Sequence, residues 1–159
     1  MMSLAEGARS HLVQFAQVRA LLGSGKGFST WVFRGQDDQA KPYVNMEGTG
    51  AAAVLLRQQG GWGTPNRHNT MTFPRLVVEV YVDPARDSRG NELSPDVMGR
   101  FTDIWAVMDR YLRNMDHTEV MWGDIRTLGC DRLDEWSVFP LSDGGGIRVS
   151  RAAYGVTLG

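Results

Sequence analysis

The stretch Leu76-Val-Val-Glu-Val-Tyr-Val82 is the part of the sequence from which the fold can be worked out. Every second residue from Leu76 onward is aliphatic, and in a β-strand such residues lie on one face. Because this face is wholly apolar, the pattern predicts a core strand of a sheet. Asp83-Pro84 ends the strand, since proline has no N–H to donate to a neighbouring strand.

A long amphipathic helix is predicted after the polar loop that follows this strand. It begins at Ser94-Pro95-Asp96. The serine can cap free N–H groups, and the aspartate complements the positive helix end. Proline lacks an N–H, but the first position of a helix does not need one. Apolar residues then recur at spacings of three and four, the period of one helical face. They are Val97, Phe101, Ile104, Trp105, Met108, Leu112 and Met115. We expect this face to lie across the sheet.

A first helix is predicted from Leu4, because Ser3 and Glu6 have the spacing of a capping box. The helical spacing of apolar residues continues up to Gly23, so one uninterrupted helix is expected, with this glycine as its end. The stretch Gly23-Ser-Gly-Lys-Gly27 lacks the spacing of a phosphate-binding loop and follows a helix instead of a strand. It therefore predicts a turn.

Further strands are predicted from alternation, aromatic or β-branched content and flanking turn residues. They span Thr30–Arg34, Ala51–Gln58, Val120–Leu128, Trp136–Leu141 and Ile147–Leu158. In the last strand the apolar residues change face partway, which predicts a β-bulge near Arg151–Ala153. The order of elements predicts an α+β class, with a mainly antiparallel sheet packed by an N-terminal helix and a central amphipathic helix. We expect residues 1–159 to form a single domain.

The composition argues against several classes of function. The 159 residues include 17 basic and 18 acidic ones without blocks of one sign, which disfavours non-specific binding to nucleic acid or to anionic membranes. Cys130 is the sole cysteine, so no disulfide framework exists, in keeping with a reducing cytoplasm. No apolar run approaches membrane-spanning length, and no signal-peptide pattern is present. We expect a soluble cytoplasmic protein with no membrane partner.

No set of residues predicts a catalytic centre, a cofactor site or a metal site. Asp37-Asp38 and Asp134-Glu135 are neighbours that point apart on an extended chain, so we interpret them as solvated charges. Cys130 has no histidine near it in sequence and is interpreted as a small apolar filler. The histidines lack the spacing that would direct two nitrogens at one metal. They are His11, His68 and His117.

The layout of the whole chain carries a resemblance. Its parts are the N-terminal helix, a Phe-Arg strand, a strand closed by Gly60-Gly61-Trp62, the strand from Pro74 to Tyr81, an arginine-bearing loop, the helix Val97-Met-Gly-Arg-Phe-Thr-Asp-Ile-Trp105, and strands ending in Tyr154-Gly-Val-Thr-Leu158. This pattern resembles the tail terminator (tail completion) proteins of long-tailed bacteriophages. The resemblance covers most of the chain and lies in the pattern, since that family has no signature motif.

The resemblance implies partners and no chemistry. It implies a ring of copies of this chain, expected to be a hexamer, that caps the tail tube protein, stops tube growth and joins the tail to a head-tail connector or neck protein. It implies no sequence-specific binding of nucleic acid, although DNA could pass through the ring. The expected location is the virion, at the head-tail junction, and the host cytoplasm during assembly.

Four residues are predicted to contact partners. Trp62 lies in a glycine-rich loop and is interpreted either as an interface anchor or as a cover for a sheet edge. Arg86 and Arg89 follow the core strand, where they could donate charge-assisted hydrogen bonds to an acidic neighbour; an ordinary solvated turn is the alternative. Arg67, in the turn-rich loop before that strand, is a further interface candidate.

Two other functions stay open from the sequence. Another phage neck or head-to-tail connector protein would share the ring and its interfaces, and binding on the portal side would distinguish it. A small enzyme with a cryptic cleft is the second alternative, and stabilisation by a ligand would distinguish that one.

Overall fold

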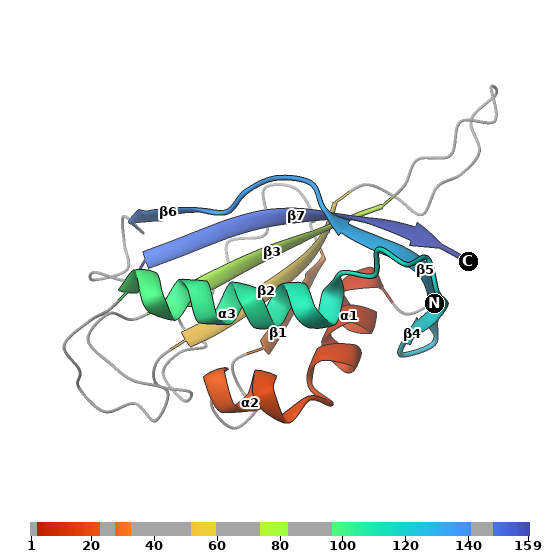
Figure 1. Cartoon of the computed structure of the whole chain (residues 1–159), viewed down its shortest axis with the longest axis horizontal. Helices are drawn as coiled ribbons and strands as arrows, with labels where there is room; N and C mark the ends of the chain where they lie inside the picture. The colour runs from red at the N-terminus through yellow and green to blue at the C-terminus, as the bar shows by residue number, and fades with distance from the viewer. Residues whose placement is uncertain (1–2, 23–27, 33–51, 60–73, 83–96, 141–147) are drawn as a thin grey trace.

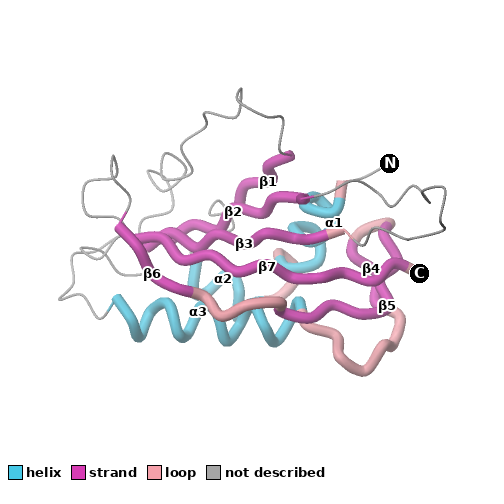
Figure 2. The backbone as a smooth tube through the Cα atoms, turned by 90° about the horizontal axis from the view of Figure 1, so that it is seen from above, coloured by secondary structure: helices cyan, strands magenta, loops and turns pink. Residues whose placement is uncertain are grey.

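The structure, a computed structural model, is one seven-stranded sheet with helices on one of its faces (Figures 1 and 2). It describes residues 3–22, 28–32, 52–59, 74–82, 97–140 and 148–159. The elements are α1 (Leu4–Leu12), α2 (Ala16–Leu22), β1 (Phe28–Val32), β2 (Ala52–Gln59), β3 (Arg75–Val82), α3 (Val97–Leu112), β4 (Val120–Trp122), β5 (Ile125–Arg132), β6 (Ser137–Pro140) and β7 (Arg148–Leu158). The predicted α+β class is confirmed.

The sheet is mainly antiparallel, as predicted. Its strand order is β1-β2-β3-β7-β5-β4, and β6 pairs with β7 on the side where β5 also lies. Only β1 and β2 pair in parallel among the described strands. We call the side covered by α1, α2 and α3 the helix face, and the other side the opposite face (Figure 2).

The predicted core strand is β3, and the structure buries more of it than the alternation indicated. Leu76, Val78, Val80 and Val82 are fully buried on the helix face, as expected. Val77, Glu79 and Tyr81 on the other side of the strand are buried as well, and Glu79 is 4% exposed; only Arg75, at the start of β3, is exposed. A charged residue therefore lies buried on the opposite face of a core strand.

The long amphipathic helix is α3, which packs lengthwise on the sheet (Figure 1). Five of the predicted core residues are buried, and the Trp105 indole nitrogen donates to Ser150 Oγ of β7 at 2.7 Å. Met115 does not belong to this face, because the helix ends at Leu112 and Met115 is 60% exposed in the turn beyond it. The predicted cap Ser94-Pro95-Asp96 lies outside the described residues. The buried residues are Phe101, Ile104, Trp105, Met108 and Leu112.

The predicted capping box is confirmed, but the single N-terminal helix is wrong. Ser3 Oγ accepts from the Glu6 N–H at 3.1 Å, and a Glu6 carboxylate oxygen accepts from the Ser3 N–H at 3.1 Å. The chain then breaks between α1 and α2, where the Phe15 ring stacks on Tyr111 of α3 with centroids 3.9 Å apart. The break directs Phe15 onto α3, and the apolar spacing conceals it because both helices face the same core. Gly23 lies outside the described residues.

Two predictions in the C-terminal half need correction. Val120–Leu128 is a hairpin of β4 and β5, turned at Gly123, whose φ of 64° is a conformation that glycine tolerates. No bulge occurs at Arg151–Ala153, since β7 pairs with β3 without a shift of register there. The apolar residues of β7 change face because Ser150, a polar residue, lies on the helix face, where it accepts from Trp105. The register shift of this part of the sheet lies in β5, between Thr127 and Gly129.

The remaining strands lie close to their predicted positions. β2 matches its prediction within one residue, and β6 lies within the predicted Trp136–Leu141. β1 begins two residues before the predicted strand, and residues 33–34 lie outside the description. No helix in the described part of the chain is long and apolar enough to cross a membrane.

Candidate interaction site

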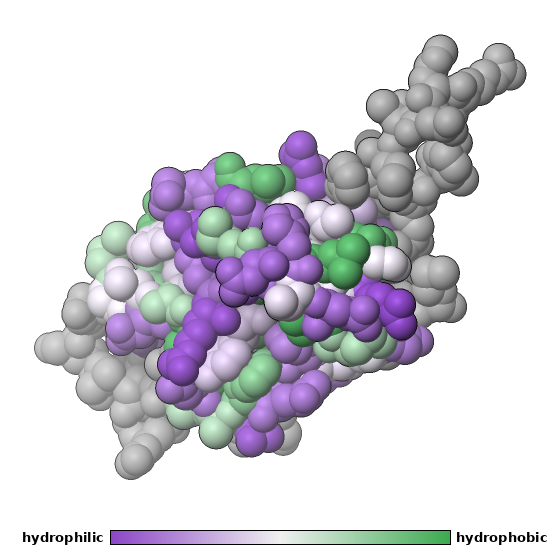
Figure 3. All heavy atoms as spheres, turned by 45° about the vertical axis from the view of Figure 1, so that its right-hand side comes forward, coloured by the Kyte–Doolittle hydropathy of each residue, from purple (hydrophilic) through white to green (hydrophobic). Residues whose placement is uncertain are grey.

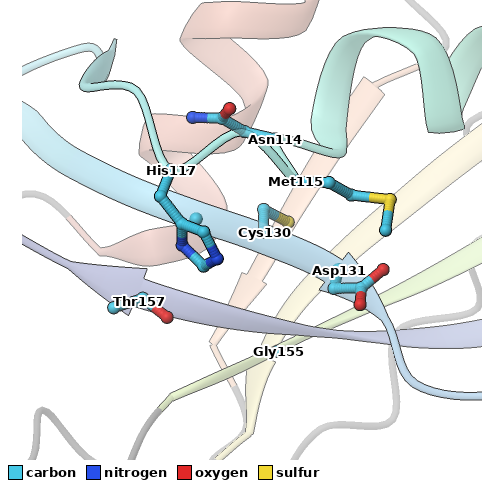
Figure 4. Close-up of a pocket in the computed structure, with 8 residues that line it drawn as sticks. Asn114, Met115, His117, Cys130, Asp131, Gly155 and Thr157 are labelled. Carbon is cyan, nitrogen blue, oxygen red and sulfur yellow. The ribbon is translucent and has the colours of Figure 1, made fainter.

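One hollow beside β5 contains groups with potential chemistry, and the geometry gives them structural roles. It has a volume of about 130 Å³, below the roughly 300 Å³ or more of typical ligand sites. His117, Cys130 and Asp131 line it, but they lie apart and do not converge on one point (Figure 4). Burial, with Asp131 nearby, raises the pKa of the Cys130 thiol to about 12, so it stays protonated at neutral pH. Cys130 thus acts as the buried filler that the sequence suggested.

The turn that closes this hollow is held by close packing. Asn114 and Cys130 exchange two backbone hydrogen bonds, of 2.8 and 3.3 Å. His117 has a φ of 55°, and its ring lies so close to Gly129 that a Cβ there would be 2.9 Å from Nδ1. A side chain at position 129 would therefore make the exposed His117 ring shift. In the described residues, no group of three or more histidine, cysteine or acidic side chains could hold a metal ion.

His11 is also structural. Its Nε2 donates to the backbone carbonyl of Tyr111 at 2.8 Å, and its ring stacks on Trp122 with centroids 5.9 Å apart. Burial lowers the pKa of His11, and the hydrogen bond to Tyr111 opposes this in part. A neutral ring with its proton on Nε2 places no charge in the buried site and still donates to the Tyr111 carbonyl. His11 therefore ties α1 to the end of α3 and to the hairpin.

A half-buried acid, Asp109 of α3, is fully engaged on the helix face. It accepts from the Tyr154 hydroxyl at 2.6 Å and from Arg132 Nη1 at 2.9 Å. Burial, followed by the hydrogen bond to Asp109, raises the pKa of Tyr154 above its ordinary value, so the hydroxyl keeps its proton. These bonds fix α3 to β5 and β7 and leave no group free for a ligand in this network.

The arrangement on the opposite face is different. Glu79 of β3 lies between Arg57 of β2 and Arg151 of β7, and we call these three residues the arginine cluster. One Glu79 oxygen lies 2.7 Å from Arg57 Nη2 and 3.3 Å from Arg151 Nε, while the other accepts from the Tyr81 hydroxyl. A buried carboxylate is costly unless it is paired, so the two arginines make this position possible. Burial, followed by the charge of Glu79, raises the pKa of Tyr81.

The arginine cluster has donors left over. Two arginines and one glutamate give it a net charge of +1. Arg57 Nε is buried without a hydrogen-bond partner, and the Arg151 side chain is 50% exposed. The Arg151 guanidinium lies 5.7 Å from the centre of the Phe139 ring, which is 36% exposed. An accessible arginine beside a partly exposed aromatic ring is the composition of strong protein contacts.

The tip of the β4–β5 hairpin carries the opposite charge at the other end of the sheet (Figure 1). Gly123 and Asp124 form the turn, and the exposed Asp124 makes no interaction in the described part of the chain. Met121 beside it is 45% exposed. At the base, Glu119 and Arg126 pair at 3.1 Å and neutralise one another. The hairpin therefore presents one unpaired carboxylate at its tip and an exposed methionine on β4, opposite Arg126.

The surface view shows no broad apolar patch on the side drawn. Hydrophobic residues lie there in small groups between polar ones (Figure 3). The exposed large hydrophobic residues of the described chain include Met98, Met115, Met121 and Leu133. On the side drawn, the described residues therefore lack the continuous apolar surface on which an obligate interface is usually built.

The interface residues chosen from the sequence cannot be placed. Trp62, Arg67, Arg86 and Arg89 all lie outside the described residues, so their roles stay predictions. The arginine cluster was missed because its members come from three strands whose pairing is not visible in the sequence. One signal was available, since Glu79 is the single charge within an apolar strand.

Comparison with known proteins identifies the fold. No protein-family model and no curated protein sequence matches this chain. Among solved structures, it is similar to a chain of the "Virion of native gene transfer agent (GTA) particle", with a TM-score of 0.61 and 14% identity. The match covers 98% of this chain and 94% of the other. The two chains therefore share one architecture over almost their whole lengths.

Proposed function

We propose that this protein is a structural component of a phage-type particle. The observation that carries the proposal is the shared fold with a chain of a gene transfer agent virion, over 98% of this chain and 94% of that one. Coverage this complete on both sides supports a role for the whole chain in such an assembly. The corresponding location is the virion, after assembly in the host cell.

Within this class, we propose the role of a tail terminator. The chain forms a ring, a hexamer, that caps the tail tube, ends its polymerisation and joins it to the neck, while DNA passes through the ring. Support comes from the order of elements, which resembles that family, and from the charged, partly unsatisfied arginine cluster on the face without helices. The partners are further copies of the chain, the tail tube protein and the connector protein.

We further propose that the protein is not an enzyme and needs no cofactor or metal. The high pKa of Cys130 and the small hollow around it support a function carried by surfaces. Adding ATP, magnesium or a chelator should leave the melting temperature unchanged, because a ligand stabilises a protein only when it binds the folded state. A clear shift with one of them would favour the enzyme alternative.

The role in capping is tested on the purified protein with isolated tail tubes. Light scattering gives the mass, and negative-stain microscopy shows whether a closed ring forms and sits on the tube end. We expect rings that bind tube ends and stop further addition of tube subunits. A protein that stays monomeric at high concentration, with no ring on the tubes, would contradict this role. Rings that bind only the portal side would select the neck or connector alternative.

A separate variant tests the loop predicted from the sequence. Replacing Arg86 and Arg89 together with glutamate should leave the melting temperature nearly unchanged, because exposed charges contribute little to stability. If the loop docks on a partner, the same change should abolish ring closure or tail joining through repulsion between like charges. Assembly at the wild-type yield would show that the loop is only a connection.

A further inference from the structure

We propose that the ring is closed by a specific contact, in which Asp124 of one copy binds the arginine cluster of the next copy through Arg151. This inference rests on the proposed ring and names its interface. The two surfaces lie at different places on the molecule, the arginine cluster on the opposite face and the tip at the end of the β4–β5 hairpin (Figure 1). A contact between two different surfaces of identical subunits is heterologous, and it produces a ring when the rotation closes.

Charge complementarity is the first argument. Glu79 neutralises only one of the two arginines, so the cluster keeps a charge of +1. Each guanidinium has five N–H donors, while Glu79 accepts through one oxygen from both arginines and through the other from Tyr81. A carboxylate from outside would therefore take donors that the cluster does not use. Asp124 is such a carboxylate, with no partner in the described part of its own chain.

The surroundings of the two charges also match. Met121 is 45% exposed beside the tip, and Phe139 is 36% exposed beside Arg151. Thioether sulfur makes favourable contacts with aromatic rings, so Met121 can pack on Phe139 while Asp124 pairs with Arg151. The contact then combines one charge-assisted hydrogen bond with a small apolar contact, as at the centre of many protein interfaces.

The same surroundings favour a protein over nucleic acid as the occupant. Binding to DNA depends on several positive charges that neutralise successive phosphates. Here a buried glutamate lies between the two arginines, and four further side chains beside them are buried: Leu55, Val77, Tyr81 and Val149. The exposed Arg75 at the start of β3 is the next positive charge on this face. The net charge of +1 at the cluster itself fits one carboxylate.

A charge exchange tests the contact. Arg151→Asp and Asp124→Arg should each reduce ring formation more than about tenfold, measured by sedimentation velocity, because each places like charges together. The double variant R151D/D124R should form rings again. The two single variants, when mixed, should also restore rings, since each supplies the surface that the other lacks. Arg110→Asp and Asp103→Arg, on the exposed side of α3, are controls that should leave ring formation unchanged.

Folding is checked by thermal melts. Arg57 still pairs with Glu79 at 2.7 Å when Arg151 is replaced, but an aspartate at position 151 stands directly opposite the buried Glu79, so R151D should lower the melting temperature more than Arg151→Gln does. If R151D does not fold, Arg151→Gln replaces it and should still weaken the ring. Rings that survive D124R, or that neither the double variant nor the mixture restores, would overturn this contact while the ring itself stands. A wild-type protein that never self-associates would overturn the proposed function as well.

Discussion

The two faces of one sheet differ in how their polar groups are treated. On the helix face, the buried Ser150 hydroxyl accepts from Trp105 and the half-buried Asp109 accepts from Tyr154. Just beyond the end of α3, Arg113 pairs with Asp131, while its Nε is buried without a partner. On the opposite face, the arginine cluster keeps a buried nitrogen without a partner and an arginine that is half exposed. The helix face thus packs the core, whereas the opposite face keeps an accessible net charge, which we propose serves recognition.

The largest effect is expected from breaking the helix face at Trp105. Trp105→Ala removes a fully buried indole and leaves the Ser150 hydroxyl without its donor, so the free energy of unfolding should fall by about 3–5 kcal/mol. Chemical denaturation measures the loss. Met98→Ala, on the same helix but 54% exposed, is the control and should change stability by less than about 0.5 kcal/mol. Equal losses in both variants would contradict this description of the core.

The next effect concerns the contact between α1 and the hairpin. A Cβ at Gly7 would lie 2.8 Å from both the Trp122 carbonyl oxygen and Ile125 Cδ1, so the helix and the hairpin must move apart in Gly7→Ala. We expect a loss of about 1–3 kcal/mol in unfolding free energy, as for other overpacked sites. Because the hairpin would shift, the variant should also form rings less well. An unchanged melting temperature would show that α1 and the β4–β5 hairpin have room for a methyl group at position 7.

Glu79→Gln sharpens the comparison from the side of the opposite face. The change removes the negative charge between Arg57 and Arg151 but leaves an oxygen for the Tyr81 hydroxyl, so we expect a loss of about 1–3 kcal/mol in unfolding free energy. Glu135→Gln is the matched control, since Glu135 also pairs with an arginine but its side chain is 88% exposed. That control should change stability by less than about 1 kcal/mol. Similar losses in the two variants would mean that burial of Glu79 has no energetic consequence.

The smallest effect is a pH dependence from His11. Burial lowers its pKa in the folded protein below the ordinary 6.5, so the unfolded chain binds a proton more readily. The stabilisation is therefore fully present above the ordinary pKa and declines as the pH falls through it. Denaturation at about pH 7.5 and about pH 5.5 should show this decline in the wild type. His11→Gln, which keeps a donor for the Tyr111 carbonyl, should show a smaller loss of stability between these two pH values. An equal loss in both proteins would mean that other titratable groups cause it.

The elements predicted well from sequence are those whose burial is one-sided and whose ends carry specific signals. The Ser3–Glu6 capping box marks the start of α1, and the period of α3 identifies its buried face. The break after Leu12 was missed because apolar residues on both sides of it face the same core. The hairpin turn at Gly123-Asp124 could have been found, since this dipeptide suits a tight turn within an alternating stretch.

The site was less predictable because it depends on which strands are neighbours. Arg57, Glu79 and Arg151 are brought together only because β3 lies between β2 and β7. No local pattern specifies that order, and β7 is far from β3 in sequence. What the sequence offered was one unexplained charge at Glu79 in an apolar strand, which marks a position that must find a partner.

The central place of β7 has a consequence for the order of events during synthesis. This strand follows the other described strands in the sequence, yet it lies between β3 on one side and β5 and β6 on the other. Until residues 148–158 leave the ribosome, β3 and β5 have unpaired edges, and the two halves of the sheet cannot join. Nascent chains are therefore open to edge-to-edge association with one another. The described sheet can be joined only after translation of β7, and the arginine cluster forms only then, because Arg151 belongs to that strand.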